Sequence, residues 1–458
     1  MTTETEHSLS TTDSVCPECL ARIPAQRVQR GDDVYLRKVC ALHGPFETIV
    51  WRGLPAYTDW ARPKIPAHPK NPVTPIDRGC PFDCGLCAEH RQQTCTALLE
   101  VTQRCDLRCP FCFASAGTVT TPDPDLTTIE SWYRRLLEAG GPYNIQLSGG
   151  EPTLRDDLPD IVALGQSLGF SFIQLNTNGV RLAKDPDYVK RLKQAGLSSV
   201  FLQFDGTSDD IFKVMRGVKL LDRKRAAIEH CAANDLGVVL VPTLVPGVNT
   251  ADLGNIVDFA LQYFPAVRGV HVQPISYFGR YPQAPTDADR ITLPEVMRAI
   301  EAQTQGRIKV ENFTTSGCEN ALCSLHANFV VMPDGTLRPW TQQASSACCT
   351  PQPAEIGAAK TRNFVATYWS STTNVVSLDS IGSSSFGEWD VFLARTKTHT
   401  FCLSGMAFQD AWNLDLDRLR DCCIHTVSPD GRLVPFCAYN LTNQHGQSLY
   451  RHHEPDAA

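Results

Sequence analysis

Three cysteines in this chain have the spacing of a metal site. Cys105, Cys109 and Cys112 follow a C-x3-C-x2-C pattern, with Phe111 just before the last cysteine. The apolar run 97–101 precedes them and is typical of a buried strand, so the following loop can present three thiolates together. Iron–sulfur clusters are usually bound by four cysteine thiolates. Three thiolates would leave one iron atom without a protein ligand. A structural zinc loop is the alternative, but such loops more often use paired C-x2-C units. We predict a cluster.

A second group of cysteines repeats this spacing. Cys80, Cys84 and Cys87 form another C-x3-C-x2-C triple, and Cys95 follows. The two triples compete for the catalytic role, but only the later one directly follows the predicted strand. We therefore predict that the earlier triple and Cys95 hold a fully ligated auxiliary 4Fe–4S cluster. A site like a zinc ribbon is the alternative.

A C-x2-C pair and a C-x2-H pair stand near the start of the chain. Their members are Cys16, Cys19, Cys40 and His43, which fit one tetrahedral site. Segment 33–39 between them alternates like a strand. A unit this short buries little core, so a metal would stabilise its fold. Zinc and a rubredoxin-like iron both fit, and the role is predicted to be structural because protein fills all four positions.

The C-terminal third carries two more cysteine pairs. Cys318 and Cys323 form one pair, and Cys422 and Cys437 flank a predicted hairpin. Each pair alone leaves a metal half-ligated, so we predict that the four together hold a second auxiliary cluster. Vicinal cysteines rarely bind one metal together, so Cys423 is left without a role.

Strands that alternate with helices must position these groups. Apolar strands separated by helical spacers, such as 129–139, indicate parallel pairing with right-handed crossovers. We predict an α/β fold with a partial (β/α)6 barrel, whose chemistry lies at the C-terminal ends of the strands. The predicted strands are 97–101, 144–147, 172–177, 199–204, 237–244 and 269–275, and hairpins are predicted at 329–338 and 425–437.

Polar residues follow several of these strands. Gly149, Gly150 and Glu151 come after the second strand, where glycines let a ligand approach the main chain closely. Amide and carboxylate side chains at other strand ends suit ribose and carboxylate contacts, although any one could cap a turn. They are Asn176, Asn178, Gln203, Asp205 and Gln273.

Composition narrows the class of protein. The 458 residues carry a net charge of −7, which gives no case for binding nucleic acid, and 42% are hydrophobic, enough for a sizeable core. No apolar run reaches the length of a membrane span. The 19 cysteines have metal-site spacings and no export signal precedes them, so we expect a reducing cytoplasm.

The motifs divide the chain into five parts. Residues 61–77 are rich in proline and indicate an extended linker. We expect a disordered lead-in (1–14), a mononuclear metal-binding domain (15–60), a linker and auxiliary-cluster segment (61–95), the barrel (96–310) and a C-terminal auxiliary-cluster domain (311–450).

The later triple, with Phe111 inside it, and the Ser148–Pro152 segment resemble the radical SAM superfamily. There, three cysteines hold a 4Fe–4S cluster, S-adenosylmethionine binds the fourth iron, and reduction yields a 5′-deoxyadenosyl radical. The resemblance implies that the later triple is catalytic. It also implies cofactor contacts at Gly149, Gly150 and Glu151. From their positions we expect further cofactor contacts at Phe111, Asn176, Asn178, Gln203, Asp205 and Gln273.

The whole motif order, from CPEC and CALHG to CCIHTVSPDGRLVPFC, is similar to the tetraether lipid synthase family, earlier described as pterin-dependent methylases. This resemblance implies S-adenosylmethionine, three 4Fe–4S clusters and one mononuclear zinc or iron. We expect radical C–C bond formation on lipid chains. The alternatives are methylation of a small molecule such as a pterin, or a non-enzymatic iron–sulfur or zinc scaffold. Expected partners are the lipid or small-molecule substrate, an electron donor such as ferredoxin or flavodoxin, and a peripherally contacted membrane, but no nucleic acid.

Overall fold

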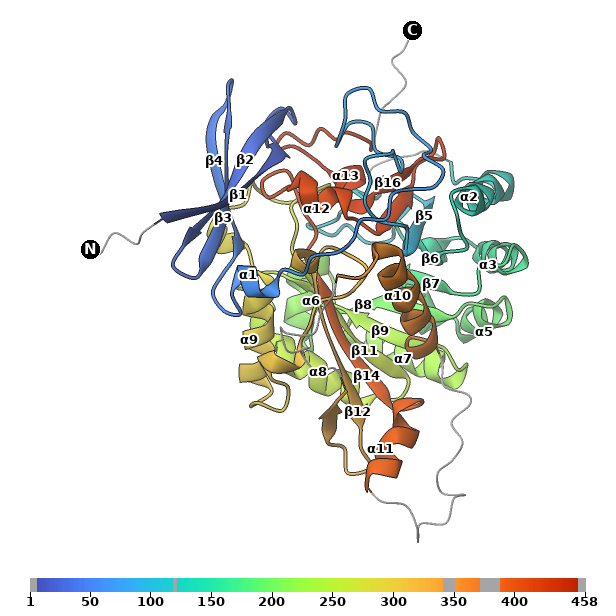
Figure 1. The fold of residues 1–458 in the computed structure, drawn as a ribbon. Helices are drawn as coiled ribbons and strands as arrows, with labels where there is room; N and C mark the ends of the chain where they lie inside the picture. Colours follow the sequence, from blue (N-terminus) through green and yellow to red (C-terminus); the bar gives the residue numbers. More distant parts are fainter. Residues whose placement is uncertain (1–5, 118–121, 341–350, 371–387, 452–458) are drawn as a thin grey trace.

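The computed structural model describes residues 6–117, 122–340, 351–370 and 388–451, and Figure 1 shows their arrangement. Six parallel strands form the centre of one mixed sheet, in the spatial order β5-β6-β7-β8-β9-β11. This confirms the predicted α/β fold with a partial barrel. The strands are β5 (Thr96–Thr102), β6 (Asn144–Gly149), β7 (Ile173–Thr177), β8 (Ser199–Gln203), β9 (Gly237–Val241) and β11 (Val267–Pro274), with the short β10 (Thr243–Leu244) beside β11.

Helices follow these strands and cover the outer face of the sheet, because each buries an apolar side. In α2, the Asp125 carboxylate caps the first turn by accepting from the Thr128 N–H at 2.8 Å. The buried residues of α2 recur at helical spacing and are Ile129, Trp132, Tyr133 and Leu136. The helices are α2 (Leu126–Glu138), α3 (Leu158–Ser167), α4 (Val180–Lys184), α5 (Pro186–Gln194), α6 (Asp209–Arg216), α7 (Leu221–Ala233), α8 (Leu253–Gln262) and α9 (Leu293–Gln303).

The C-terminal segment extends the same sheet at both edges. β14 pairs in parallel with β11 and antiparallel with β12, while β15 pairs in parallel with β5 at the other edge. Both predicted hairpins are present, as β12–β13 and β15–β16. The elements are β12 (Ser324–Val331), β13 (Leu337–Pro339), α10 (Ala354–Tyr368), α11 (Glu388–Thr396), β14 (Thr400–Met406), α12 (Leu416–Arg420), β15 (Ile424–Val427), β16 (Leu433–Pro435) and α13 (Phe436–Asn440).

Four antiparallel strands form a second, small sheet at the N-terminal end, drawn in blue in Figure 1. The prediction of disorder was wrong for residues 6–14, which lie in the edge strand β1. Most side chains of β1 are at least partly exposed, so its polar composition resembles that of a disordered segment. The elements are β1 (Glu6–Val15), β2 (Arg22–Arg30), β3 (Asp33–Cys40), β4 (Gly44–Trp51) and the short α1 (Tyr57–Trp60).

Buried polar contacts join this small sheet to the C-terminal segment. Arg27 donates to both carboxylate oxygens of Asp415 at 2.8 Å. The buried ammonium group of Lys38 donates to the Ser14 hydroxyl at 3.0 Å and to the Ala411 carbonyl at 2.7 Å. Buried charges need such partners, so these contacts fix the docking of the small sheet. Among the described residues, no helix is both long enough and apolar enough to cross a bilayer.

Candidate active site and metal centres

A cavity of about 400 Å³ lies inside the barrel. The loop after β5 lines one end of it with Cys105, Cys109 and Cys112, and Cys95, which precedes β5, lines the other. All but one of the predicted cofactor contacts line the same cavity. They are Phe111, Gly149, Gly150, Glu151, Asn176, Asn178, Gln203 and Gln273.

Arg280 holds the cysteine loop in place. Its Nε donates to the Cys109 carbonyl at 2.9 Å, and Nη1 donates to the Ala116 carbonyl at 3.2 Å. The backbones of Arg280 and Cys112 exchange two hydrogen bonds of 2.9 Å. A Cβ on the neighbouring Gly279 would lie 2.4 Å from the Cys112 carbonyl oxygen, so glycine is needed for this close approach.

Gly149 and Gly150 pack against the same cysteine loop. The Gly150 N–H donates to the Thr102 carbonyl at 2.8 Å. A Cβ on Gly149 would lie 2.1 Å from the Thr102 carbonyl oxygen, and one on Gly150 would lie 2.1 Å from that of Arg104. Close approach of a ligand was the reason predicted for these glycines. The structure adds a second reason, which is that two loops meet backbone to backbone.

Glu151 connects the ends of two strands. Its carboxylate accepts from the Thr177 hydroxyl at 2.7 Å, the Asn178 N–H at 2.7 Å and the Thr153 N–H at 3.0 Å. Burial raises the pKa of Glu151, and these hydrogen bonds to the charged form oppose the rise. The carboxylate therefore fixes the loop after β6 to the end of β7. Its contact with the cofactor stays a prediction.

Asp205 is the exception among the predicted cofactor contacts, because it does not line the cavity. Its buried carboxylate accepts two hydrogen bonds of 2.7 Å from the Arg216 guanidinium. Arg216 lines the cavity instead and lies 3.5 Å from the Phe111 carbonyl. We therefore correct the prediction: Asp205 orients Arg216. Sequence reasoning missed Arg216, although its place four residues after the buried Phe212 was an available signal.

Amide side chains from adjacent strands form a row along the cavity wall. Asn176 donates to Gln146 at 3.5 Å, and Gln146 donates to Gln174 at 2.9 Å. Gln174 in turn donates to the Ser199 hydroxyl at 3.3 Å. The Oδ1 of Asn176 and the Nδ1 of His326 are buried without a hydrogen-bond partner. Such atoms are costly, and a bound polar ligand would satisfy them.

Aromatic rings form another part of the cavity wall. Phe201 and Trp369 are stacked with ring centroids 5.7 Å apart, and His271 lies edge-on to Trp369. The His271 Nδ1 lies 2.8 Å from the Ser404 hydroxyl. Burial lowers the pKa of His271 to about 4, so this imidazole is neutral at neutral pH. Sequence reasoning missed these residues, because they come from distant segments and no periodic pattern connects them.

The four predicted ligands of the mononuclear site converge. The ligand atoms of Cys16, Cys19, Cys40 and His43 all lie within 4.8 Å of one another. The Leu42 N–H and the His43 side chain outweigh burial and lower the pKa of Cys40 to about 6, which favours the thiolate that a metal requires. This donor set fits one tetrahedral metal ion.

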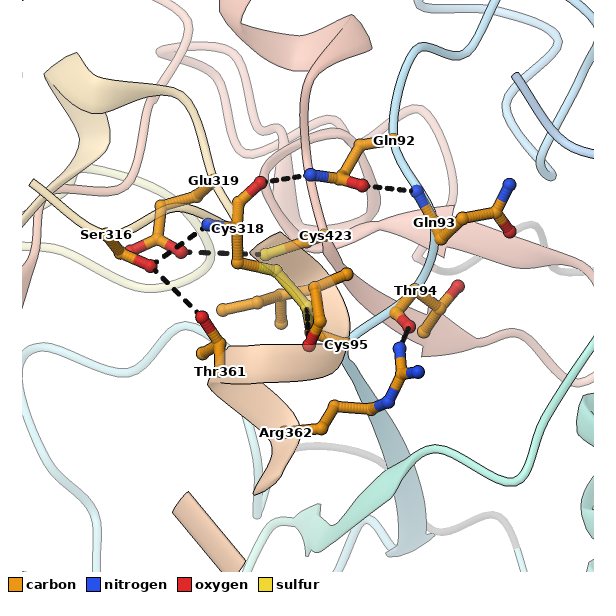
Figure 2. Close-up of a disulfide and its surroundings, with 12 residues drawn as sticks. Gln92, Gln93, Thr94, Cys95, Ser316, Cys318, Glu319, Thr361, Arg362 and Cys423 are labelled. Atoms are coloured by element: carbon orange, nitrogen blue, oxygen red, sulfur yellow. Dashed lines mark hydrogen bonds between the residues drawn. A yellow bond between two sulfur atoms is a disulfide. The ribbon is translucent and has the colours of Figure 1, made fainter. Parts of the chain in front are cut away.

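The structure regroups the auxiliary-cluster cysteines. Cys95 is bonded to Cys318, and the sulfur atoms of Cys95, Cys318 and Cys423 all lie within 4.8 Å of one another (Figure 2). Assigning Cys95 and Cys318 to two different clusters was therefore wrong, and Cys423, to which we gave no role, lies beside them. The pairing of β15 with β5 places Cys423 beside Cys95, and spacing along the chain could not show this.

Two further triples of thiols remain. Cys80 and Cys84 share a hydrogen bond, and Cys87 interacts electrostatically with Cys80. Burial raises the pKa of Cys437 well above its usual range, and the charges of Cys422 and Cys323 add to the rise. Neither triple is among the groups whose ligand atoms all lie within 4.8 Å of one another in the described residues, so metal binding by these thiols stays a prediction.

Comparisons with known proteins agree with this geometry. Residues 99–260 match the model of the radical SAM superfamily, and residues 8–52 match that of the HMPTM N-terminal zinc ribbon domain. The chain is 34% identical over 478 aligned positions to the 7,8-dihydro-6-hydroxymethylpterin dimethyltransferase of Methanocaldococcus jannaschii, covering 94% of this chain and 93% of that protein.

More distant matches cover less of the chain. The GTP 3′,8-cyclase of Heliobacterium modesticaldum is 30% identical over 39% of this chain and 54% of its own length. The crystal structure of Streptococcus suis SuiB has a TM-score of 0.39 and 17% identity, covering 47% of this chain and 46% of that one. The length and identity of the match to the pterin dimethyltransferase place the chain in its family, within the radical SAM superfamily.

Proposed function

We propose that this radical SAM enzyme methylates a pterin-like heterocycle. The observation that carries the proposal is that a single cavity is lined both by the cysteine loop and by a wall that contains unpaired polar atoms. The buried Oδ1 of Asn176 can accept from a ring N–H or amino group, and Nδ1 of His326 offers a further polar contact. The stacked Phe201 and Trp369 suit the flat face of such a ring.

The pterin methylation for which the M. jannaschii relative is named supports this proposal. C–C coupling of lipid chains, our first expectation, has no support from the comparisons. A cavity of about 400 Å³ is of the size usual for small-molecule sites, and a hydrocarbon chain would leave the Oδ1 of Asn176 without a partner.

The residues of the chain would act by binding and positioning. Cys105, Cys109 and Cys112 would hold a 4Fe–4S cluster, since three thiols from one loop line the cavity together. When bound and reduced, such a cluster would supply the electron for cleaving S-adenosylmethionine to a 5′-deoxyadenosyl radical. Arg216 would present its guanidinium to the carboxylate of the cofactor, and the walls of the cavity would exclude water from the radical.

The balance of the proposed reaction defines what to measure. If S-adenosylmethionine supplies the methyl group, one molecule abstracts hydrogen and leaves 5′-deoxyadenosine and methionine. A second donates its methyl group and leaves S-adenosylhomocysteine. The two steps together take up two electrons, for which we propose ferredoxin or flavodoxin as the donor.

The test is anaerobic turnover of the reconstituted full chain with dithionite, S-adenosylmethionine and 7,8-dihydro-6-hydroxymethylpterin, read by mass spectrometry. We expect a pterin product heavier by one or two CH2 units. A lipid extract is the parallel arm. Coupled lipid products, with an unchanged pterin, would refute the proposal.

Asn176→Leu tests recognition of the heterocycle. This variant keeps the side-chain size but removes the unpaired acceptor, so we expect the KM for the pterin to rise about tenfold or more. The exposed Asn255→Leu is the matched control and should leave the KM unchanged. An unchanged KM in Asn176→Leu would remove this residue from the binding site.

A further inference from the structure

We propose that the exposed basic side chains of residues 213–225, the basic segment, form a docking surface for an acidic electron-carrier protein. The proposal rests on the reaction above, which takes up two electrons, and not on the identity of the substrate. Although the whole chain has a net charge of −7, this segment contains six cationic residues and one aspartate. The cationic residues are Lys213, Arg216, Lys219, Arg223, Lys224 and Arg225.

The two buried cations of the basic segment face the cysteine loop. The Arg216 guanidinium lies 3.5 Å from the Phe111 carbonyl oxygen and also interacts with the Cys109 thiol. The charge of the buried Lys224 ammonium group acts on Cys109 as well. The basic segment, which runs from the last turn of α6 into the first turns of α7, therefore packs against the loop that would hold the 4Fe–4S cluster.

The other four cations of the basic segment are exposed. Within the described parts of the chain, neither the Lys219 ammonium group nor the Arg223 guanidinium has a hydrogen bond or ion pair, so both are available to a partner. Val214 and Val218 of the same segment are 54% and 40% exposed. A small apolar centre with a charged rim suits a protein contact. The four exposed cations are Lys213, Lys219, Arg223 and Arg225.

The stability of α7 does not explain its basic residues. The first turn of this helix carries Arg223, and Lys224 and Arg225 follow. Cations at the N-terminus of a helix oppose the helix dipole, and acidic residues are favoured there. Lys224 offsets this cost by donating to the Asn178 carbonyl at 2.6 Å. The exposed Arg223 makes no such contact, so a role in binding a partner accounts for it better than a role in folding.

The position of the basic segment favours an electron carrier among acidic partners. A basic surface steers an acidic protein toward it. A carrier bound here would lie beside the loop of Cys109, whose side chain is itself partly exposed. Electron transfer slows steeply with distance, so this short separation matters. Each encounter would oxidise the carrier by one electron and reduce the cluster by one, and two encounters would supply the two electrons of the proposed reaction.

The test measures 5′-deoxyadenosine formed by the reconstituted full chain with two reductants, dithionite or a flavodoxin with its NADPH-dependent reductase. Lys219→Glu combined with Arg223→Glu should lower the flavodoxin-driven rate about tenfold or more at low salt. The dithionite-driven rate should stay unchanged, because a small reductant needs no docking surface. Calorimetric titration with oxidised flavodoxin is the second measurement, and its Kd should rise about tenfold or more.

The matched control reverses two exposed charges at the opposite end of the barrel. Lys360→Glu combined with Lys397→Glu makes the same change in net charge, on α10 and just before β14, and should alter neither the rates nor the Kd. If the variant at Lys219 and Arg223 fails to fold, glutamine at both positions replaces glutamate, with a smaller loss expected.

Equal flavodoxin-driven rates in the two double variants, or equal Kd values, would overturn the proposal. An equal loss with both reductants would also overturn it, because the basic segment would then support the cysteine loop and not a carrier. If wild type forms no 5′-deoxyadenosine even with dithionite, the proposed reaction fails, while the titration with flavodoxin still decides whether this surface binds a carrier.

Discussion

Single residues at the loop after β6 determine whether the cysteine loop can be held. The φ angle of Gly150 is not in the left-handed region that favours glycine. A Cβ there would nevertheless lie 2.1 Å from the Arg104 carbonyl oxygen. A backbone carbonyl cannot move aside as easily as a flexible side chain. An added methyl group would therefore displace the backbone of the cysteine loop.

Gly150→Ala should therefore displace the loop that carries Cys105, Cys109 and Cys112. We expect a loss of about 1–3 kcal/mol in the free energy of unfolding and of most 5′-deoxyadenosine formation. Urea denaturation and chromatography of the turnover mixture measure the two effects. Gly317→Ala is the control for the loss of glycine, because its φ is not left-handed and a Cβ there would make only an ordinary contact with the Gly357 Cα at 3.5 Å. Equal activity in the two variants would contradict the clash.

His271 gives a residue-scale prediction for pH. Its pKa is about 4 in the folded protein because of burial, against an ordinary value of 6.5. As pH falls below 6.5, the imidazole of His271 is protonated in the unfolded chain but stays neutral in the folded one. The free energy of unfolding then falls by up to about 1.4 kcal/mol per pH unit.

His271→Gln removes the titrating imidazole. The free energy of unfolding of this variant should therefore fall less steeply than that of wild type between pH 7 and 5. Thermal or urea unfolding at several pH values measures both slopes. Parallel slopes would show that His271 is not the group responsible.

At the scale of elements, the ion pair of Asp205 and Arg216 connects the end of β8 to α6. Asp205→Asn would leave the guanidinium buried and uncompensated, so we expect a cost of about 3–5 kcal/mol in the free energy of unfolding. Combining it with Arg216→Met should recover part of that cost, which a double-mutant cycle in urea would reveal. Asp210→Asn, at an exposed pair on the same helix, should leave the unfolding midpoint unchanged.

Much of this element order could be predicted from the sequence. Each of the six strands is a short apolar run followed by polar residues, and that pattern is local. The edges of the sheet could not be predicted, because the segment between the hairpins shows no periodicity and β14 reaches β11 only in the folded chain. The proximity of Cys95 and Cys423 could not be predicted for the same reason. It depends on the pairing of β5 with β15, which are far apart in the sequence.

At the scale of the whole molecule, the N-terminal sheet depends on its metal site and on its docking. Four short strands bury little apolar area, so metal binding should supply much of their stability. The ion pair of Arg27 with Asp415 then attaches this unit to the C-terminal segment.

Cys40→Ser should loosen the small sheet while the barrel stays folded. We expect hydrogen–deuterium exchange in residues 6–52 to speed up by about tenfold or more, with exchange in β5–β9 unchanged. Mass spectrometry of the intact and digested protein measures this. Cys231→Ser, which removes a buried thiol from α7, serves as the control, and equal protection of residues 6–52 in both variants would show that the metal is not needed there.

Arg451, near the end of the chain, has a consequence for how the protein is made. Its guanidinium is buried against the Glu100 carboxylate on β5, and one nitrogen lies 3.0 Å from Oε2. β15, which borders β5, also comes from the last tenth of the chain. A nascent chain that has not yet reached these residues lacks both contacts, so the strand that leads into Cys105, Cys109 and Cys112 stays incomplete until residues 424–451 have been made. Delivery of iron and sulfide to that loop would accordingly follow the synthesis and docking of this segment.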